Sequence, residues 1–330
     1  MTEFPASGPS IERVRAVAQT LTPRVIRTPS VPWAGLDSPI AGELWVKLEL
    51  LQRTGSFKAR GALNSLLQLL DVGKGVVAFS AGNHAIAVAW ASRELGFDAT
   101  VVMPRSANPA RVAKVEQLGA RIVYGDTVAD LLAIVERLQL EQGRSLIHPF
   151  DGVPIVEGTA TVGLELSEDV SGLDAVYVPV GGGGLIAGVA SAVKQLSPNC
   201  RVVGVEPEGA DGMRQSLAAG APIDKVEVST IADSLGAPMH RAYTYSLIEQ
   251  YVDDIVTVSD NEMRRAMSSL FNDMKLAVEP ACASTLAALT AAGQAGNHAT
   301  DRVLMVACGS NLDEQTWYSH IQLGKEMAQA

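Results

Sequence analysis

A single lysine, Lys58, stands in the part of the chain that offers the most chemistry. It follows an aromatic residue, Phe57, and lies between two glycines, Gly55 and Gly61. A lysine held against apolar surface has a lowered pKa, because burial disfavours its charged form, and its amine can then act as a nucleophile or a base. An isolated phenylalanine–lysine pair is more often a core ring beside a solvated charge, so other segments must distinguish the two interpretations.

A run of four glycines, Gly181–Gly184, supplies a second candidate site. It lies between a predicted strand at 175–180 and a predicted helix at 185–196. Backbone N–H groups at such a junction can close on a phosphate, and the helix N-terminus adds positive potential. The alternative is a plain turn, which four consecutive glycines disfavour because each costs conformational entropy. The run also satisfies a dinucleotide-binding pattern, with Glu206 placed to bind a ribose.

Two further polar segments follow predicted strands. The segment Ser80–His84 comes after the strand at 76–79, and its backbone donors, serine hydroxyl and asparagine amide suit a carboxylate. The alternative is an N-cap beside a solvated asparagine. Ser310 follows a late strand at 303–306, where it could serve only as a cap.

The elements that must position these residues alternate between strands and helices. Apolar bursts separated by helical patterns predict an α/β fold with parallel strands. Ser259 and Glu262 form a predicted capping box for a helix that runs through residue 275. No repeat or low-complexity linker divides the chain, so we predict two interleaved domains. Residues 1–67 and 149–330 would form a large domain, residues 75–148 a small one, and residues 68–74 their connection.

Composition excludes several classes of protein. The chain has 330 residues, of which 47% are hydrophobic and 19% charged, as in a packed enzyme. Its net charge is −10 without a basic run, so we expect no nucleic-acid partner. No apolar run or signal pattern indicates a membrane or an export route. Three scattered cysteines indicate free thiols in a reducing compartment, so a cytoplasmic enzyme is predicted.

Four segments together resemble the fold type II pyridoxal-phosphate (PLP) enzymes, the group of threonine dehydratases and serine racemases. In the family's order they are Lys47–Ala62, Ser80–Ala85, Gly181–Leu185 and Cys308–Asn311. The resemblance covers nearly the whole chain, from about residue 28 to residue 311. It implies a tryptophan synthase β-like fold, in which two interleaved domains each have a mostly parallel sheet flanked by helices.

The resemblance also implies a role for each segment. Lys58 would bind PLP as a Schiff base and later act as general base, with Phe57 packed against the cofactor ring. Ser310 would face the pyridine nitrogen and leave it unprotonated, and Asn83 would contact the 3′-oxygen. The phosphate would be held by Gly181, Gly182, Gly183, Gly184 and Leu185. The substrate carboxylate would be held by Ser80, Ala81, Gly82, Asn83 and His84.

The activity that the resemblance implies is α,β-elimination. We predict a PLP-dependent dehydratase (ammonia-lyase) that converts L-threonine or L-serine to a 2-oxo acid and ammonia. Ala81 stands where serine racemases carry a second serine, and a methyl group has no acid–base function, which disfavours racemisation. A racemase, a dehydratase for another 3-hydroxy amino acid and a nicotinamide-dependent oxidoreductase are the alternatives. We expect a homodimer with a small-molecule amino-acid substrate and no membrane partner.

The chain departs from the family pattern at two pocket segments. Residues 157–161 read Glu-Gly-Thr-Ala-Thr where the family has Ala-Gly-Gln-Gly-Thr, and residue 234 is serine where the family has glycine. Both changes leave the pocket contacts of these segments open. Phe150 and Glu279 match the family, although Phe150 could equally be structural and Glu279 could be only a surface acid.

A divalent cation, Mg²⁺ or Ca²⁺, is a further possibility that the resemblance raises. Glu206 and Ala210 match two ligand positions of the family members that bind one. The third ligand position holds Gly212, although Asp211 lies next to it. Asp211 is the candidate substitute for the third ligand, so the sequence leaves open whether the site is occupied.

Overall fold

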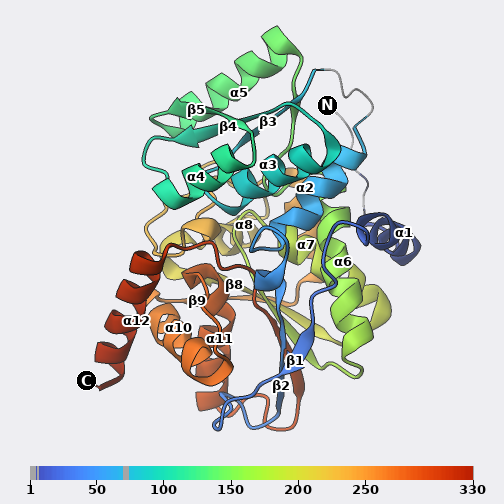
Figure 1. Ribbon diagram of the computed structural model, residues 1–330. Helices are drawn as coiled ribbons and strands as arrows, with labels where there is room; N and C mark the ends of the chain where they lie inside the picture. The colour runs from blue at the N-terminus through green and yellow to red at the C-terminus, as the bar shows by residue number, and fades with distance from the viewer. Residues whose placement is uncertain (1–4, 6, 70–73, 330) are drawn as a thin grey trace.

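The computed structural model describes residue 5, residues 7–69 and residues 74–329, which form an α/β structure with two separate sheets (Figure 1). One sheet has the strand order β1-β2-β10-β7-β8-β9 and the other the order β5-β4-β3-β6. Every pairing is parallel except that of β1 with β2. The predicted fold class is therefore confirmed. None of the described helices is both long and apolar enough to cross a membrane.

The smaller sheet and its helices form what we call the small unit. Its strands are β3 (Val76–Phe79), β4 (Ala99–Pro104), β5 (Arg121–Gly125) and β6 (Ser145–Leu146), and its helices are α3 (Asn83–Leu95), α4 (Pro109–Gln117) and α5 (Val128–Gln142). The described parts of the rest of the chain form the large unit. We propose on this topology the domain division predicted above, of which residues 1–4, 6, 70–73 and 330 lie outside the described residues.

The large unit surrounds the larger sheet. Its strands are β1 (Ser30–Pro32), β2 (Glu43–Lys47), β7 (Ala175–Pro179), β8 (Arg201–Pro207), β9 (Asp254–Val258) and β10 (Arg302–Val306). Its α-helices are α1 (Ile11–Leu21), α2 (Lys58–Leu67), α6 (Val153–Asp169), α7 (Gly184–Leu196), α8 (Gly212–Ala219), α9 (Ala242–Tyr251), α10 (Asp260–Met274), α11 (Pro280–Gln294) and α12 (Glu314–Gln329). Three 3₁₀ turns are η1 (Glu49–Leu51), η2 (Glu208–Ala210) and η3 (Asp233–Leu235).

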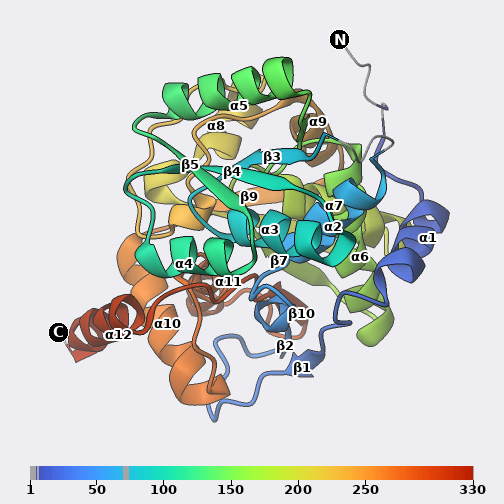
Figure 2. The ribbon, with the colours of Figure 1, turned by 45° about the horizontal axis from the view of Figure 1, so that its top comes forward.

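Helices join the two units through a continuous stack. Helix α3 packs on α2, α2 on α6, and α6 on α7, which lies against β7 and β8 (Figure 2). Leu63 and Leu66 of α2 share a hydrophobic core with Val76 and Val88 of the small unit. Helix α2 therefore packs on both units, and Lys58 is its first residue.

The candidate site residues follow the carboxyl ends of parallel strands. Strand β3 leads into Ser80–His84, β7 into Gly181–Gly184, and β10 into Cys308–Asn311. Open α/β sheets bind ligands at this edge, because strand ends and helix N-termini meet there. The order of the strands thus brings segments far apart in the sequence to one region between the sheets.

Candidate active site

Lys58 begins α2 at the boundary between the two units. Its Nζ donates a hydrogen bond of 2.5 Å to the carbonyl oxygen of Pro149 and lies 5.1 Å from the centroid of the Phe57 ring. Burial lowers the pKa of Lys58 from 10.5 to about 8. An amine with this pKa is partly neutral near physiological pH, whereas a solvated lysine is not.

A buried network of charges anchors the helix that carries Lys58. The guanidinium of Arg60 donates to both oxygens of Glu49, from Nε at 2.9 Å and Nη2 at 2.7 Å, and its Nη1 donates to Glu165 at 2.7 Å. Nζ of Lys47 donates to the same Glu165 at 2.8 Å. All four side chains are buried. The network ties α2 to η1, β2 and α6, and the sequence prediction did not include it.

The glycine run forms a loop in which side chains do not fit. Gly183 has a φ of +91° and is the N-cap of α7. A Cβ at Gly182 would lie 2.1 Å from the Phe150 ring, and one at Gly184 would lie 2.3 Å from the Phe150 carbonyl oxygen. The first N–H groups of α7 have no intrahelical partner, and a glycine N-cap has no side chain to accept from them. They are suited to an anion such as a phosphate.

Asn83 links the small unit to a buried acid of the large unit. It is the first residue of α3, and its Nδ2 donates to Oε1 of Glu279 at 2.8 Å. Ser234 donates to the same oxygen at 3.0 Å. Burial raises the pKa of Glu279, whose Oε2 has no hydrogen-bond partner among the described residues. The departure from the family at position 234 therefore contacts Glu279, which is a buried residue of the site and not a surface acid.

One pocket between the units brings most of these residues together. It is lined by Phe57, Lys58, Asn83, Phe150, Pro179, Gly181, Gly182, Gly183, Gly184, Leu185, Ser234, Leu235, Glu279, Ala281 and Cys308. An adjoining cavity is lined in part by His84, Pro149 and Thr159. The lining residues do not include Ser310, whose N–H donates to Gly55 at 2.9 Å and whose hydroxyl lies 3.5 Å from the Leu50 carbonyl.

The segment Ser80–His84, which is predicted to hold the substrate carboxylate, lies at the edge of this pocket and contributes Asn83 to its lining. The Ser80 hydroxyl accepts a hydrogen bond of 3.1 Å from the N–H of Gly82, which stabilises the turn before α3. His84 points inward, with Nε2 2.9 Å from the carbonyl oxygen of Ile147. Burial and the nearby Lys58 lower the pKa of His84 to about 3, so its imidazole is neutral at physiological pH. The loop therefore carries no charge of its own.

Comparison with known proteins decides the family. The chain matches the family model described as "Pyridoxal-phosphate dependent enzyme" over residues 21–309. The protein is a PLP-dependent enzyme. It is 50% identical over 280 residues to phenylserine dehydratase of Ralstonia pickettii, which covers 84% of this chain and 86% of that protein. It is 38% identical over 308 residues to the catabolic L-threonine dehydratase of Escherichia coli K12, with 92% and 93% covered.

Solved structures agree with this membership. Maize serine racemase superposes with a TM-score of 0.90 at 36% identity, over 99% of this chain and 100% of that one. Threonine deaminase isoform 2 of Solanum lycopersicum gives a TM-score of 0.90 at 30% identity, over 98% and 96%. The predicted family and cofactor are thereby confirmed. The alternative of a nicotinamide-dependent oxidoreductase is not consistent with membership of a PLP-dependent family.

The chemistry of the pocket fits PLP. The cofactor needs an amine for its aldehyde, donors for its phosphate and an apolar surface for its ring. Lys58, the N–H groups at Gly181–Gly184 and the Phe57 ring offer these three features in one pocket. Oε2 of Glu279, which has no hydrogen-bond partner in the described part of the chain, adds a polar atom that a ligand can satisfy.

The proposed cation ligands do not fit a metal ion. Both oxygens of Glu206 accept hydrogen bonds of 2.8 Å from backbone N–H groups, those of Met213 and Arg214 at the start of α8. Burial raises the pKa of Glu206 to about 8. Asp211 is bonded to Arg214 and Gln215. Among the described residues, no group of three or more histidine, cysteine, aspartate or glutamate side chains could hold a metal. We therefore propose no metal step at Glu206 and Ala210. The same backbone hydrogen bonds engage both oxygens of Glu206, so this carboxyl group is not available to bind a ribose either.

The departure at 157–161 serves helix packing more than the pocket. Glu157 faces α1, where it accepts a hydrogen bond of 2.6 Å from Arg13. Gly158, which the family shares, permits close contact with α2, because a Cβ there would lie 2.6 Å from the carbonyl oxygen of Arg60. Thr159 donates to the carbonyl oxygen of Gly184 at 2.7 Å. This last contact supports the glycine loop from behind.

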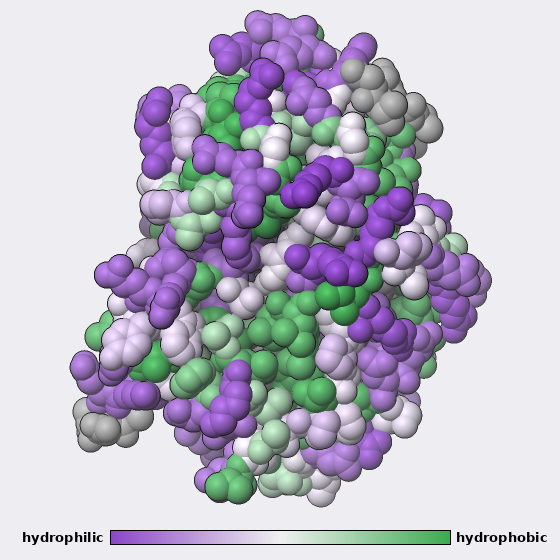
Figure 3. Space-filling view, in the orientation of Figure 1, coloured by the Kyte–Doolittle hydropathy of each residue, from purple (hydrophilic) through white to green (hydrophobic). Residues whose placement is uncertain are grey.

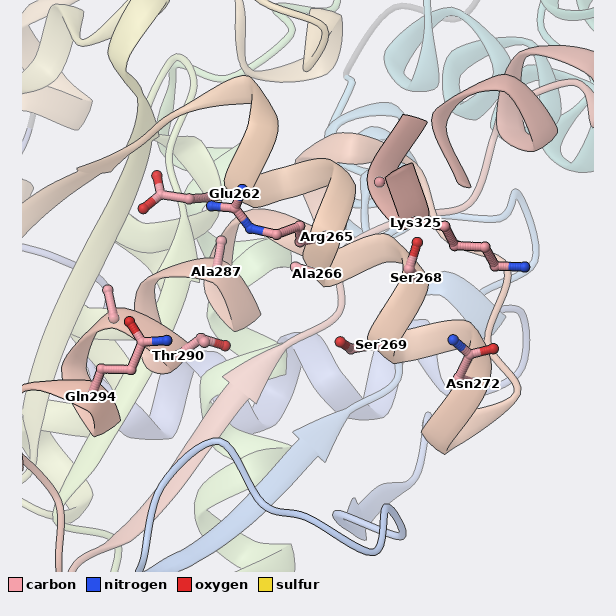
Figure 4. A pocket seen from close by; sticks show the side chains of 12 residues that line it. Glu262, Arg265, Ala266, Ser268, Ser269, Asn272, Ala287, Thr290, Gln294 and Lys325 are labelled. Atoms are coloured by element: carbon pink, nitrogen blue, oxygen red, sulfur yellow. The ribbon is translucent and has the colours of Figure 1, made fainter. Parts of the chain in front are cut away.

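A larger groove lies elsewhere on the large unit, among α10, α11 and α12 (Figure 4). Its volume is about 430 Å³, and Glu262, Arg265, Thr290 and Lys325 are among its lining residues. It contains neither Lys58 nor the glycine loop, so the smaller pocket between the units is the candidate active site.

Proposed function

We propose that this PLP-dependent enzyme is a dehydratase that eliminates water from a 3-hydroxy amino acid. The enamine that results takes up one water and gives a 2-oxo acid and ammonia, so no water is lost overall. The observation that carries the proposal is Lys58, a partly buried amine with a pKa of about 8, in one pocket with the glycine loop, Asn83 and Glu279. The dehydratases among its relatives support the same reaction class.

The chain's own residues would divide the work as follows. When bound, PLP supplies a ring that stabilises negative charge at the α-carbon. The neutral Nζ of Lys58 removes the α-proton, and the low pKa of this amine makes it a competent base near neutral pH. The N–H groups of Gly181–Gly184 hold the phosphate, and the loop Ser80–His84 holds the substrate carboxylate.

Elimination is favoured over racemisation by Ala81. Racemisation needs a proton donor on the side of the α-carbon opposite Lys58. Ala81 stands at the position where a serine could provide one, and its methyl group has no proton to transfer. A relative from rice that is named serine racemase is 38% identical. The fold alone therefore does not distinguish a dehydratase from a racemase, and we base the distinction on the residue at position 81.

For the substrate we propose a 3-hydroxy amino acid with an uncharged aromatic side chain, as in 3-phenylserine. The relative with 50% identity is named for this substrate. The pocket lining supports an uncharged side chain, because its apolar residues include Phe57, Phe150 and Leu235, and Lys58 and Glu279 are its charged ones. The burial that raises the pKa of Glu279 would also disfavour a charged carboxylate on the substrate side chain. L-Threonine and L-serine form the second candidate, supported by the dehydratase at 38% identity.

A substrate panel tests the reaction and the side-chain preference together. The PLP-loaded protein is incubated with 3-phenylserine, threonine, serine and 3-hydroxyaspartate, and both 2-oxo acid and ammonia are measured. We expect equal amounts of the two products, with the highest kcat/KM for 3-phenylserine and the lowest for 3-hydroxyaspartate. D-amino acid formation without 2-oxo acid from any substrate would overturn the proposal.

We also propose a cytoplasmic homodimer. Figure 3 shows hydrophobic residues gathered on the lower half of one face, over the large unit. Exposed apolar area of this kind is commonly covered by a partner. Sedimentation equilibrium at micromolar concentration tests the dimer, and a mass equal to one chain would contradict it.

A further inference from the structure

Helix α4 and its N-cap present three polar side chains to the large unit. Asn108, Arg111 and Lys114 are spaced by three residues, so they lie on one face. Asn108 donates to Asp313 at 2.7 Å, Lys114 donates to the side chain of Asn311 at 3.0 Å, and Nε of Arg111 donates to the Asn311 carbonyl at 2.9 Å. This face of α4 thus spans the boundary between the units.

Arg111 is the most buried of the three side chains, with 4% of its surface exposed. Its guanidinium forms an ion pair with Asp233 of η3, in the large unit, and the second contact, from Nη2 to Oδ1, measures 3.3 Å. A Cβ at Gly82 would lie 3.2 Å from Nη1 of Arg111. The guanidinium therefore packs directly on the loop proposed to bind the substrate carboxylate.

The contacts of Arg111 close a ring of polar residues beside the pocket, and three members of this ring, Asn83, Ser234 and Glu279, line it. Asp233 precedes Ser234, which donates to Glu279 at 3.0 Å, and Asn83 donates to the same oxygen at 2.8 Å. Asn311 donates to Oδ1 of Asn83 at 2.8 Å, and its carbonyl accepts from Arg111. We call these six residues the interface ring: Asn83, Arg111, Asp233, Ser234, Glu279 and Asn311.

We infer that Arg111 is a positioning residue for the elimination, an inference that rests on the proposed function. Through Asp233 and Asn311 it holds the loop Ser80–His84, including Asn83, in a fixed position at the pocket that contains Lys58. An enzyme loses substrate affinity when the group that binds one end of the substrate can move relative to the reacting atoms. Arg111 itself need not touch the substrate.

Buried ion pairs add little stability compared with apolar residues of similar volume, because desolvation offsets the attraction. Asp233 is also 55% exposed, which weakens its ion pair further. A role confined to stability would therefore leave substrate binding unchanged in a variant that folds. The positioning role predicts a selective change in KM.

The test uses Arg111→Met, Asp233→Asn and the double variant. The control is Arg105→Met, which removes an arginine of the small unit that pairs with Asp126 at 3.0 Å on the exposed surface. We expect both single variants to raise KM, by about tenfold or more for Arg111→Met, with kcat changed by less than about threefold. The double variant should be no worse than Arg111→Met, because the two residues act as one pair. Arg105→Met should match the parent.

Amide hydrogen exchange of residues 80–84 supplies a readout that does not depend on catalysis. Measured without amino acid, exchange should be faster in Arg111→Met and Asp233→Asn than in the parent and the control. Unchanged exchange in both variants, or a KM within about twofold of the parent in both, overturns the inference. If Arg111→Met fails to fold, Asp233→Asn decides alone. A parent protein that forms no 2-oxo acid from any substrate contradicts the proposed function, whereas the exchange experiment still tests Arg111.

Discussion

Lys58 and Glu279 line the same pocket with pKa values shifted in opposite directions. Burial lowers the pKa of Lys58 to about 8 and raises that of Glu279. In both residues burial disfavours the charged form. Burial of Lys58 also lowers the stability of the folded protein at pH values where the amine is protonated, because folding must then remove a charged group from water.

Replacing Lys58 with methionine should therefore abolish catalysis and stabilise the cofactor-free protein. The unfolded lysine keeps its proton up to pH 10.5 and the folded one only to about 8, so the penalty is full below pH 8 and fades as pH rises to 10.5. We expect a gain on the order of 2 kcal/mol at pH 7, less than the full shift because Lys58 keeps some contact with solvent. Urea unfolding at pH 7 and pH 10.5 measures it, and an equal gain at both values would contradict the burial argument.

Glu279→Gln should stabilise the cofactor-free protein at neutral pH and leave it unchanged at acidic pH. The raised pKa means that the folded protein holds this proton after the unfolded chain has lost it, so stability falls as pH rises above 4.5. Glutamine has no such titration. Thermal unfolding of both proteins at pH 4 and pH 7 tests the sign, and a variant that is less stable at pH 7 would show that the carboxylate is needed in its charged form.

Single residues of the site could be predicted only in part from the sequence. Lys58 and Asn83 lie in recognisable segments, and both line the pocket. The role of Glu279 cannot be predicted from the sequence, because its burial and its hydrogen bond to Asn83, 196 residues away, depend on the packing of the two units. The role of Arg111 also depends on this packing, because its own segment reads as an ordinary amphipathic helix and its partners Asp233 and Asn311 lie in the other unit.

At the scale of elements, loops and helix ends position the chemistry. The predicted capping box of Ser259 and Glu262 is present at the start of α10, because this signal is local. Helix α3 begins at Asn83, although its apolar pattern begins only at Ile86. The first turn of a helix that faces a ligand carries polar residues, and an apolar periodicity does not include them.

The glycine loop before α7 should not tolerate even one methyl group. Gly182→Ala would place a Cβ 2.1 Å from the Phe150 ring, so the loop or the ring must move. We expect PLP affinity to fall by about tenfold or more, as the phosphate donors are displaced. Titration of the apoprotein with PLP measures the affinity. Adding Phe150→Ala should recover part of the loss, and no recovery would place the conflict elsewhere.

The buried network beneath α2 should make Arg60 indispensable. Arg60→Met leaves Glu49, which is fully buried, without its main cation. Removing one partner of such a pair typically costs about 3–5 kcal/mol. Urea unfolding should show this loss, with a smaller effect for Arg13→Met, because Arg13 is 47% exposed and its partner Glu157 keeps hydrogen bonds from Asn64 and Gln68. Equal effects of the two variants would contradict the importance of burial.

At the scale of the whole molecule, two parallel sheets bring strand ends from both units to one pocket. The fold class and the family could be predicted, because four segments in order are specific and the strands are strongly apolar. The contacts between the units could not be predicted, because the residues of the interface ring come from segments that lie far apart in the sequence.

Lys58 is the centre of this molecule's proposed chemistry, and one measurement tests its role directly. The PLP-loaded protein is reduced with borohydride, digested and analysed by mass spectrometry to find the lysine that carries the cofactor. The parent protein should carry it on Lys58 and on no other lysine, and Lys58→Ala should carry none. Cofactor attached to a different lysine, or none on the parent protein under conditions in which it forms 2-oxo acid, would contradict the central role of Lys58.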